Sequence, residues 1–91
     1  MAPDSVPALF RPMTVGNMTL AHRIVHCPLT RCRADKDHVP TDLMVQYYEQ
    51  RSRIPGTLFI TEAAIIAPEA GTMEHTPGIW SDEQVAAWKK V

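Results

Sequence analysis

The pattern of hydrophobic and polar residues first predicts a hairpin and a strand. Two short mixed segments, Met13–Val15 and Met18–Leu20, flank Gly16-Asn17, and glycine readily adopts the positive φ that a two-residue hairpin turn needs. Residues 23–27 follow as a largely apolar segment, which reads as a buried strand. Pro28 ends this strand because it has no N–H group to donate to a sheet.

From Thr41 onward the pattern changes to the period of a helix. Apolar groups recur at three- and four-residue spacing and form one stripe: Leu43, Met44, Tyr47, Tyr48 and the stem of Arg51. Thr41 is a suitable N-cap, and Pro55-Gly56 is expected to stop the helix. The pattern therefore predicts an amphipathic helix over residues 41–53, in which the two tyrosines serve core packing rather than the stacking of bases.

A second strand and a second helix follow. Residues 57–61 are apolar on both faces, as in a parallel strand that is covered on both sides. A long connection leads to Trp80, and Ser81 with Gln84 three residues later predicts a capping box at the start of a helix. The order of hairpin, strand, helix, strand and helix predicts an α/β protein with a parallel sheet and a right-handed crossover.

These elements bury little apolar surface for a chain of 91 residues. Ordering the chain costs about 1.5 kcal/mol per residue, or roughly 140 kcal/mol in all. Two parallel strands and one and a half helices do not offset that cost. The chain therefore reads as the beginning of a larger fold, and we expect that it does not form a stable monomer alone.

Composition excludes several classes of protein. The chain is 45% hydrophobic and 21% charged, as in globular proteins, and its net charge of −1 offers no basic surface to nucleic acid or to a membrane. The apolar runs are too short for a transmembrane helix. The N-terminus lacks the basic start and apolar core of a signal peptide. We therefore expect a cytoplasmic protein.

The cysteines and histidines do not predict a metal site. Cys27 and Cys32 could form a disulfide by count, but nothing in the sequence points to secretion, where such bonds persist. His22 and His26 would face the same side of a strand but lie roughly 13 Å apart, too far to share an ion. We expect reduced, inert thiols and no bound metal.

Three segments together carry a family resemblance: LFRPMTVGNMTLAHRIVHCPLTRCRA, YYEQRSRIPGTLFITEAA and HTPGIWSDEQVAAWKKV. In order and spacing they resemble the N-terminal quarter of the Old Yellow Enzyme family, whose members are FMN-dependent ene-reductases on a (β/α)8 barrel. The resemblance extends from about Leu9 to Val91. It is greatest to fungal members, including those that act in alkaloid pathways.

Residues 1–8 read as a loose N-terminal arm, and the resemblance implies that residues 9–91 are the N-terminal part of an FMN-binding (β/α)8 TIM barrel. The hairpin would plug the N-terminal mouth of the barrel. Residues 23–28 would be its first strand, 41–53 its first helix and 57–62 its second strand. The resemblance also implies FMN as the cofactor, NADPH as the reductant and a small-molecule enone or enal as the substrate.

The same resemblance implies where the cofactor binds. Functional residues of such barrels lie at the C-terminal ends of the strands. The backbone of Pro28, Leu29 and Thr30 would meet the isoalloxazine ring there, and the Thr30 hydroxyl would donate a hydrogen bond near its C4 carbonyl oxygen. Ala63, after the second strand, matches a small residue whose backbone approaches the flavin.

Other interpretations of these residues stay open. Taken alone, Thr30 is a loop hydroxyl that caps the backbone. Arg31 and Arg33 suit either phosphate binding or a structural role at the surface, and we favour the structural role. His75 could be an acid–base group, but its place in a long loop favours a turn or rim residue. Met73 stands near the expected active-site mouth, where relatives carry an aromatic residue.

The family's catalytic residues have no match in this sequence. A His/Asn or His/His pair that binds the substrate carbonyl oxygen and a tyrosine proton donor lie further along the family's chain than Val91. We therefore predict no catalytic residue here. Two functional hypotheses remain: the start of an NADPH-dependent reductase of activated C=C bonds, or a non-catalytic product, either a truncated remnant or an interaction module.

Overall fold

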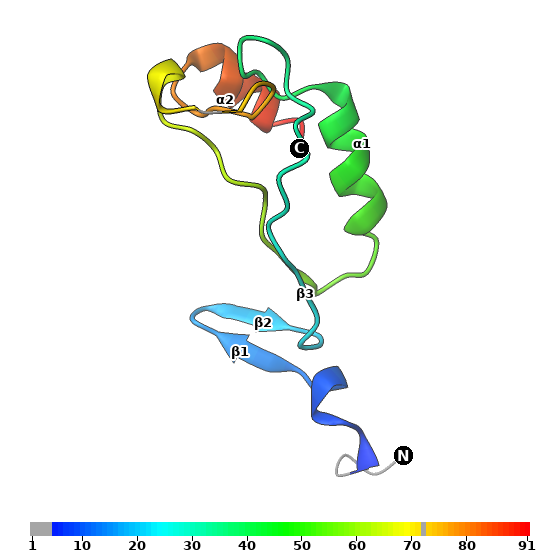
Figure 1. Cartoon of the computed structure of the whole chain (residues 1–91). Coiled ribbons are helices and arrows are strands. Elements are labelled where there is room, and N and C mark those ends of the chain that lie inside the picture. Colours follow the sequence, from blue (N-terminus) through cyan, green and yellow to red (C-terminus); the bar gives the residue numbers. More distant parts are fainter. Residues whose placement is uncertain (1–4, 72) are drawn as a thin grey trace.

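The computed structural model describes residues 5–71 and 73–91. Figure 1 shows the hairpin of β1 and β2 at one end of the described chain and both helices at the other. The elements in chain order are η2 (Ala8–Phe10), β1 (Met13–Val15), β2 (Met18–Leu20), β3 (Val25–His26), α1 (Asp42–Arg51), β4 (Leu58–Phe59), η3 (Pro68–Ala70) and α2 (Asp82–Trp88). Residues 1–4 of the predicted N-terminal arm lie outside the described residues.

The predicted hairpin is confirmed. Strands β1 and β2 pair antiparallel, with Met13 opposite Leu20 and Val15 opposite Met18. Gly16 has a φ of +59°, so the turn uses the left-handed conformation that glycine adopts without a steric penalty. Among the hairpin residues only Leu20 is buried.

The predicted parallel pair is also confirmed, but its regular pairing is shorter than expected. β3 pairs with β4 in parallel register, Val25 opposite Leu58 and His26 opposite Phe59. One further bond joins the Ile60 N–H to the His26 carbonyl at 3.1 Å. The ladder covers only part of residues 23–28 and 57–62.

Helix α1 begins and ends within the predicted range of 41–53. Thr41 occupies the N-cap position, but its side chain makes no capping bond to the helix. Its hydroxyl instead donates to the Arg33 carbonyl at 2.6 Å. The predicted capping role of Thr41 is therefore wrong, because a tertiary contact with the preceding loop takes its hydroxyl.

The capping box predicted for the second helix is confirmed. The Ser81 Oγ accepts a bond from the Gln84 N–H at 3.1 Å, and the Gln84 Oε1 accepts one from the Ser81 N–H at 3.1 Å. Gln84 is fully buried and its Nε2 also donates to the Asp37 carbonyl. The start of α2 is therefore attached to the loop that follows β3.

The core is small and lies between α1, β4 and α2. Ala34, Met44 and Tyr48 are buried, and Tyr47, Phe59 and Trp88 pack against them, which confirms the packing role predicted for both tyrosines. The radius of gyration is 16.4 Å, against about 12 Å for a compact chain of this length. The described residues thus form an open arrangement, and none of their helices is long and apolar enough to cross a membrane.

Candidate functional site

The C-terminal ends of β3 and β4 lie at the same edge of the parallel pair. Both segments that leave them run toward the end of the chain that holds the helices (Figure 1). Thr30, which follows β3, and Ala63, which follows β4, line one cavity of about 170 Å³. The other lining residues are Ile65, Ala70, Met73 and Thr76. Two predicted site residues that are 33 positions apart in sequence are thus brought together.

The predicted site residues are exposed rather than part of the core. Pro28, Leu29, Thr30 and Ala63 all belong to the exposed class, and Leu29 is 46% exposed. The Thr30 hydroxyl makes no hydrogen bond within the described part of the chain, so it does not cap the backbone. It is free to donate to a ligand in the cavity.

A buried polar pair lies directly beside Ala63. The Tyr48 hydroxyl on α1 donates to the Glu62 Oε2 at 2.6 Å, and the Glu62 N–H donates to the Tyr48 hydroxyl oxygen at 3.0 Å. Burial, together with the bond to Glu62, raises the pKa of Tyr48, so its hydroxyl keeps the proton. The sequence pattern did not predict this pair. An acidic residue immediately after an apolar strand was the signal for it.

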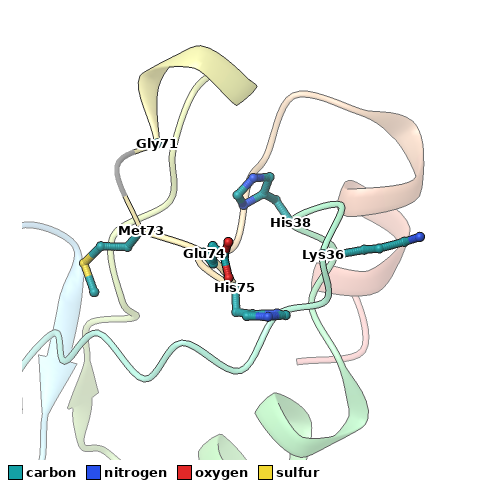
Figure 2. Close-up of a pocket in the computed structure, with 6 residues that line it drawn as sticks. All are labelled: Lys36, His38, Gly71, Met73, Glu74 and His75. Atoms are coloured by element: carbon teal, nitrogen blue, oxygen red, sulfur yellow. The ribbon is translucent and has the colours of Figure 1, made fainter.

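Two loops are joined by histidines near a second cavity (Figure 2). This cavity, of about 280 Å³, is lined by Lys36, His38, Gly71, Met73, Glu74 and His75. The His38 Nδ1 lies 2.6 Å from the Thr76 carbonyl oxygen, and the His75 Nδ1 lies 2.9 Å from the Ala34 carbonyl oxygen. A carbonyl only accepts, so both Nδ1 atoms carry protons in these bonds. Lys36 extends away from both rings (Figure 2).

The backbone conformation of His38 and His75 indicates a structural role in joining the two loops. His38 and His75 have φ values of +62° and +61°, a left-handed conformation that is uncommon outside glycine. Backbone bonds from the Ala34 N–H to the His75 carbonyl and from the Gly78 N–H to the His38 carbonyl hold the same loops together. The structure thus places His75 in a turn, as predicted, with its Nδ1 engaged by a backbone carbonyl.

Arg31 and Arg33 lie on the α1 side of the loop after β3. The Arg33 Nη1 donates to the Arg31 carbonyl at 2.8 Å. The Arg31 guanidinium lies 5.4 Å from the centre of the Tyr47 ring, and that of Arg51 lies 3.9 Å from it. Both Arg31 and Arg33 are exposed, and the contacts described for them are to backbone and to an aromatic ring.

The two cysteines are free thiols, and His22 and His26 contact different residues. Cys27 is an exposed free thiol and Cys32 a half-buried one. The His22 Nε2 lies 2.8 Å from the Thr57 Oγ1, and His26 stacks on Phe59 with ring centres 4.0 Å apart. Among the described residues, no group of three or more His, Cys, Asp or Glu side chains could hold a metal ion.

Comparisons with known proteins identify the class of protein to which this chain belongs. The sequence profile of the NADH:flavin oxidoreductase / NADH oxidase family matches residues 8–91. The chain therefore belongs to this family of flavin-dependent oxidoreductases.

Particular relatives agree with this assignment. A chanoclavine-I aldehyde reductase from Penicillium roqueforti is 53% identical over 83 residues, which are 91% of this chain and 22% of the relative. A probable NADPH dehydrogenase from Candida albicans is 51% identical over 83 residues, again 91% of this chain and 20% of the relative. The crystal structure of an Old Yellow Enzyme from Pichia sp. superposes with a TM-score of 0.87 at 45% identity, over 97% of this chain and 23% of that one.

The comparisons also confirm the predicted fold. The chain spans about a fifth of the length of these relatives, and it corresponds to an N-terminal α/β portion of the Old Yellow Enzyme barrel. FMN and a nicotinamide reductant are the cofactors of the family. The resemblance from about Leu9 to Val91 is confirmed almost to the residue by the matched range.

Proposed function

We propose that this chain forms one edge of the FMN site of an NADPH-dependent reductase that acts on the C=C bond of α,β-unsaturated carbonyl compounds. The observation that carries the proposal is the shared cavity of Thr30 and Ala63 at the C-terminal ends of two parallel strands. Active sites of (β/α)8 barrels lie at this face.

The residues at this edge fit a flavin ring. Ala63 presents only a methyl group beside its backbone, so a flat aromatic ring can approach closely. Leu29 offers an exposed apolar side chain, and the Thr30 hydroxyl has no competing partner in the described chain. The site therefore combines apolar contact with one free donor, which suits the carbonyl edge of an isoalloxazine.

The chain's own residues have distinct tasks in this proposal. Bound FMN would supply hydride transfer between NADPH and the alkene. The Pro28–Thr30 backbone would support one side of the ring, and the Thr30 hydroxyl would donate to the C4 carbonyl oxygen, where it would stabilise negative charge. Ala63 would keep the approach to the ring open.

The substrate class follows from the family and from the relatives. We propose a small-molecule enal or enone, because one relative is named for the reduction of an aldehyde, chanoclavine-I aldehyde. An alkaloid pathway is the setting that this relative favours.

The proposal is tested in a chimeric barrel, in which residues 8–91 of this chain replace the matching stretch of the Penicillium roqueforti relative. We expect the chimeric barrel to purify with FMN and to oxidise NADPH when an enal is added. Ala63→Leu should expel FMN because the longer side chain enters the cavity. Ala86→Leu, at an exposed position of α2, is the control and should keep FMN.

Two results would contradict the proposal. One is a folded chimeric barrel that holds no FMN. The other is an Ala63→Leu variant that binds FMN as tightly as Ala86→Leu. A barrel that binds FMN but does not oxidise NADPH in the presence of any enal or enone would support the non-catalytic hypothesis instead.

A further inference from the structure

One tyrosine holds residue 62 at two points. Tyr48 is 4% exposed and Glu62 is 3% exposed, so the contact is shielded from water. The Tyr48 hydroxyl donates to the Glu62 carboxylate and also accepts from the Glu62 backbone N–H. A side chain on α1 thereby holds both the backbone and the side chain of a residue in the segment that follows β4.

The Tyr48–Glu62 contact lies just beyond the last hydrogen bond between β3 and the segment of β4. The last ladder-type bond is that of the Ile60 N–H to the His26 carbonyl, and the next backbone bond along the chain is that of the Ile65 N–H to the Pro77 carbonyl. Between them, in residues 61–64, the only backbone N–H that donates a described hydrogen bond is that of Glu62. Tyr48 is therefore the hydrogen-bonding support of this stretch.

As a purely structural contact, the Tyr48–Glu62 pair is unfavourable in free energy. The Glu62 Oε1 is buried and has no hydrogen-bond partner within the described residues. A buried carboxylate with an unpaired oxygen costs free energy, and a well-packed apolar pair of similar volume is often at least as stabilising. A role in positioning explains why a polar pair stands here.

The supported stretch carries the predicted flavin contact. Ala63 follows Glu62 directly, is exposed, and lines the cavity that it shares with Thr30. We infer that Tyr48 and Glu62 are positioning residues, which hold the backbone of Ala63 at the distance from Thr30 that the flavin edge requires. This inference rests on the proposed FMN site.

The decisive variant is Tyr48→Phe in the chimeric barrel. It keeps the ring in the core but removes both bonds to Glu62. We expect FMN binding to weaken about tenfold, which corresponds to about 1.4 kcal/mol, together with a shift of the visible flavin absorption. Tyr47→Phe is the matched control, because its hydroxyl makes only a marginal contact of 3.5 Å with the His26 Nε2. We expect it to change FMN binding less than about twofold.

Two further variants separate positioning from stability. Glu62→Gln keeps an acceptor for Tyr48 and the backbone bond, so FMN binding should stay near that of the unsubstituted chimeric barrel. Tyr48→Phe/Glu62→Met removes the buried charge as well as the hydroxyl. Its melting temperature should recover relative to Tyr48→Phe alone, while FMN binding should remain weak because the backbone support is still missing.

The outcomes distinguish this inference from the proposed function. If the unsubstituted chimeric barrel holds no FMN, the proposed site itself fails. If it holds FMN and Tyr48→Phe binds FMN like Tyr47→Phe, the positioning role is refuted. It is also refuted if the double variant recovers FMN binding together with its melting temperature, since the pair would then act through stability alone.

Discussion

Removal of the Thr30 hydroxyl should change the redox behaviour of a bound flavin. The hydroxyl is exposed at the cavity shared with Ala63 and has no partner in the described chain. A donor placed at the C4 carbonyl oxygen strengthens its bond as the ring gains charge on reduction. Thr30→Ala in the chimeric barrel therefore removes stabilisation from the reduced form more than from the oxidised form.

The size of the effect follows from the strength of such a bond. A hydrogen bond to a charged group contributes about 1.5–3 kcal/mol. For a two-electron couple, 1.4 kcal/mol corresponds to about 30 mV. The reduction potential of the flavin should therefore fall by roughly 30–65 mV in Thr30→Ala.

Stopped-flow measurement of the two half-reactions is the assay. Reduction by NADPH should slow because the flavin is a poorer acceptor. Hydride delivery to the alkene should not slow, because the reduced flavin is a stronger donor. Thr61→Ala is the matched control: this threonine is also exposed near the end of β4 but lines a different cavity, with Phe59 and Trp88. Equal slowing of both half-reactions at an unchanged potential would refute the reasoning and make Thr30 a loop hydroxyl.

Three further predictions concern stability. Gly56→Ala should lower the free energy of unfolding of the chimeric barrel more than Gly16→Ala does, as measured by denaturant unfolding. Both glycines have positive φ, which costs a residue with a Cβ about 1–2 kcal/mol, but only at Gly56 would the new Cβ lie 2.6 Å from the Ala21 Cβ. Equal losses of stability in the two variants would contradict this prediction. Burial, and then the bond to Glu62, raise the pKa of Tyr48 in the folded state. The stability that Tyr48 confers is therefore fully present below its unfolded pKa of about 10 and is lost as the pH rises above that value. Tyr48→Phe should lack this alkaline loss of stability, and parallel pH profiles of stability for the two proteins would count against the prediction. The isolated 91-residue chain should show no cooperative thermal transition, since Ile24, Val25 and Ile60 are exposed beside a two-strand sheet; a sharp two-state melt at low concentration would overturn this expectation.

Elements governed by local chemistry could be predicted from the sequence. Gly16-Asn17 fixes the hairpin turn, and Ser81 with Gln84 fixes the start of α2. These features depend on residues a few positions apart. The order of the elements and the parallel pairing of β3 with β4 follow in the same way from the hydrophobic pattern.

Features set by distant contacts could not be predicted. The Thr41 hydroxyl binds the Arg33 carbonyl instead of capping its own helix, and the Tyr48–Glu62 pair joins residues 14 positions apart. The left-handed conformations of His38 and His75 are stabilised by bonds between two loops rather than by local preference. In the candidate site, the resemblance implied Thr30 and Ala63, whereas the bonds from Tyr48 to Glu62, the residue before Ala63, became visible only in the structure.

The crystal structure of the chimeric barrel with FMN bound would test the central claim most directly, through the distance from the Thr30 Oγ1 to the C4 carbonyl oxygen of the flavin. We predict an O–H···O hydrogen bond of about 2.5–3.0 Å, with the Ala63 backbone in contact with the same ring. A flavin bound elsewhere, or one whose C4 carbonyl oxygen lies beyond hydrogen-bonding distance of Thr30, would contradict the proposal that the ends of β3 and β4 form the flavin edge.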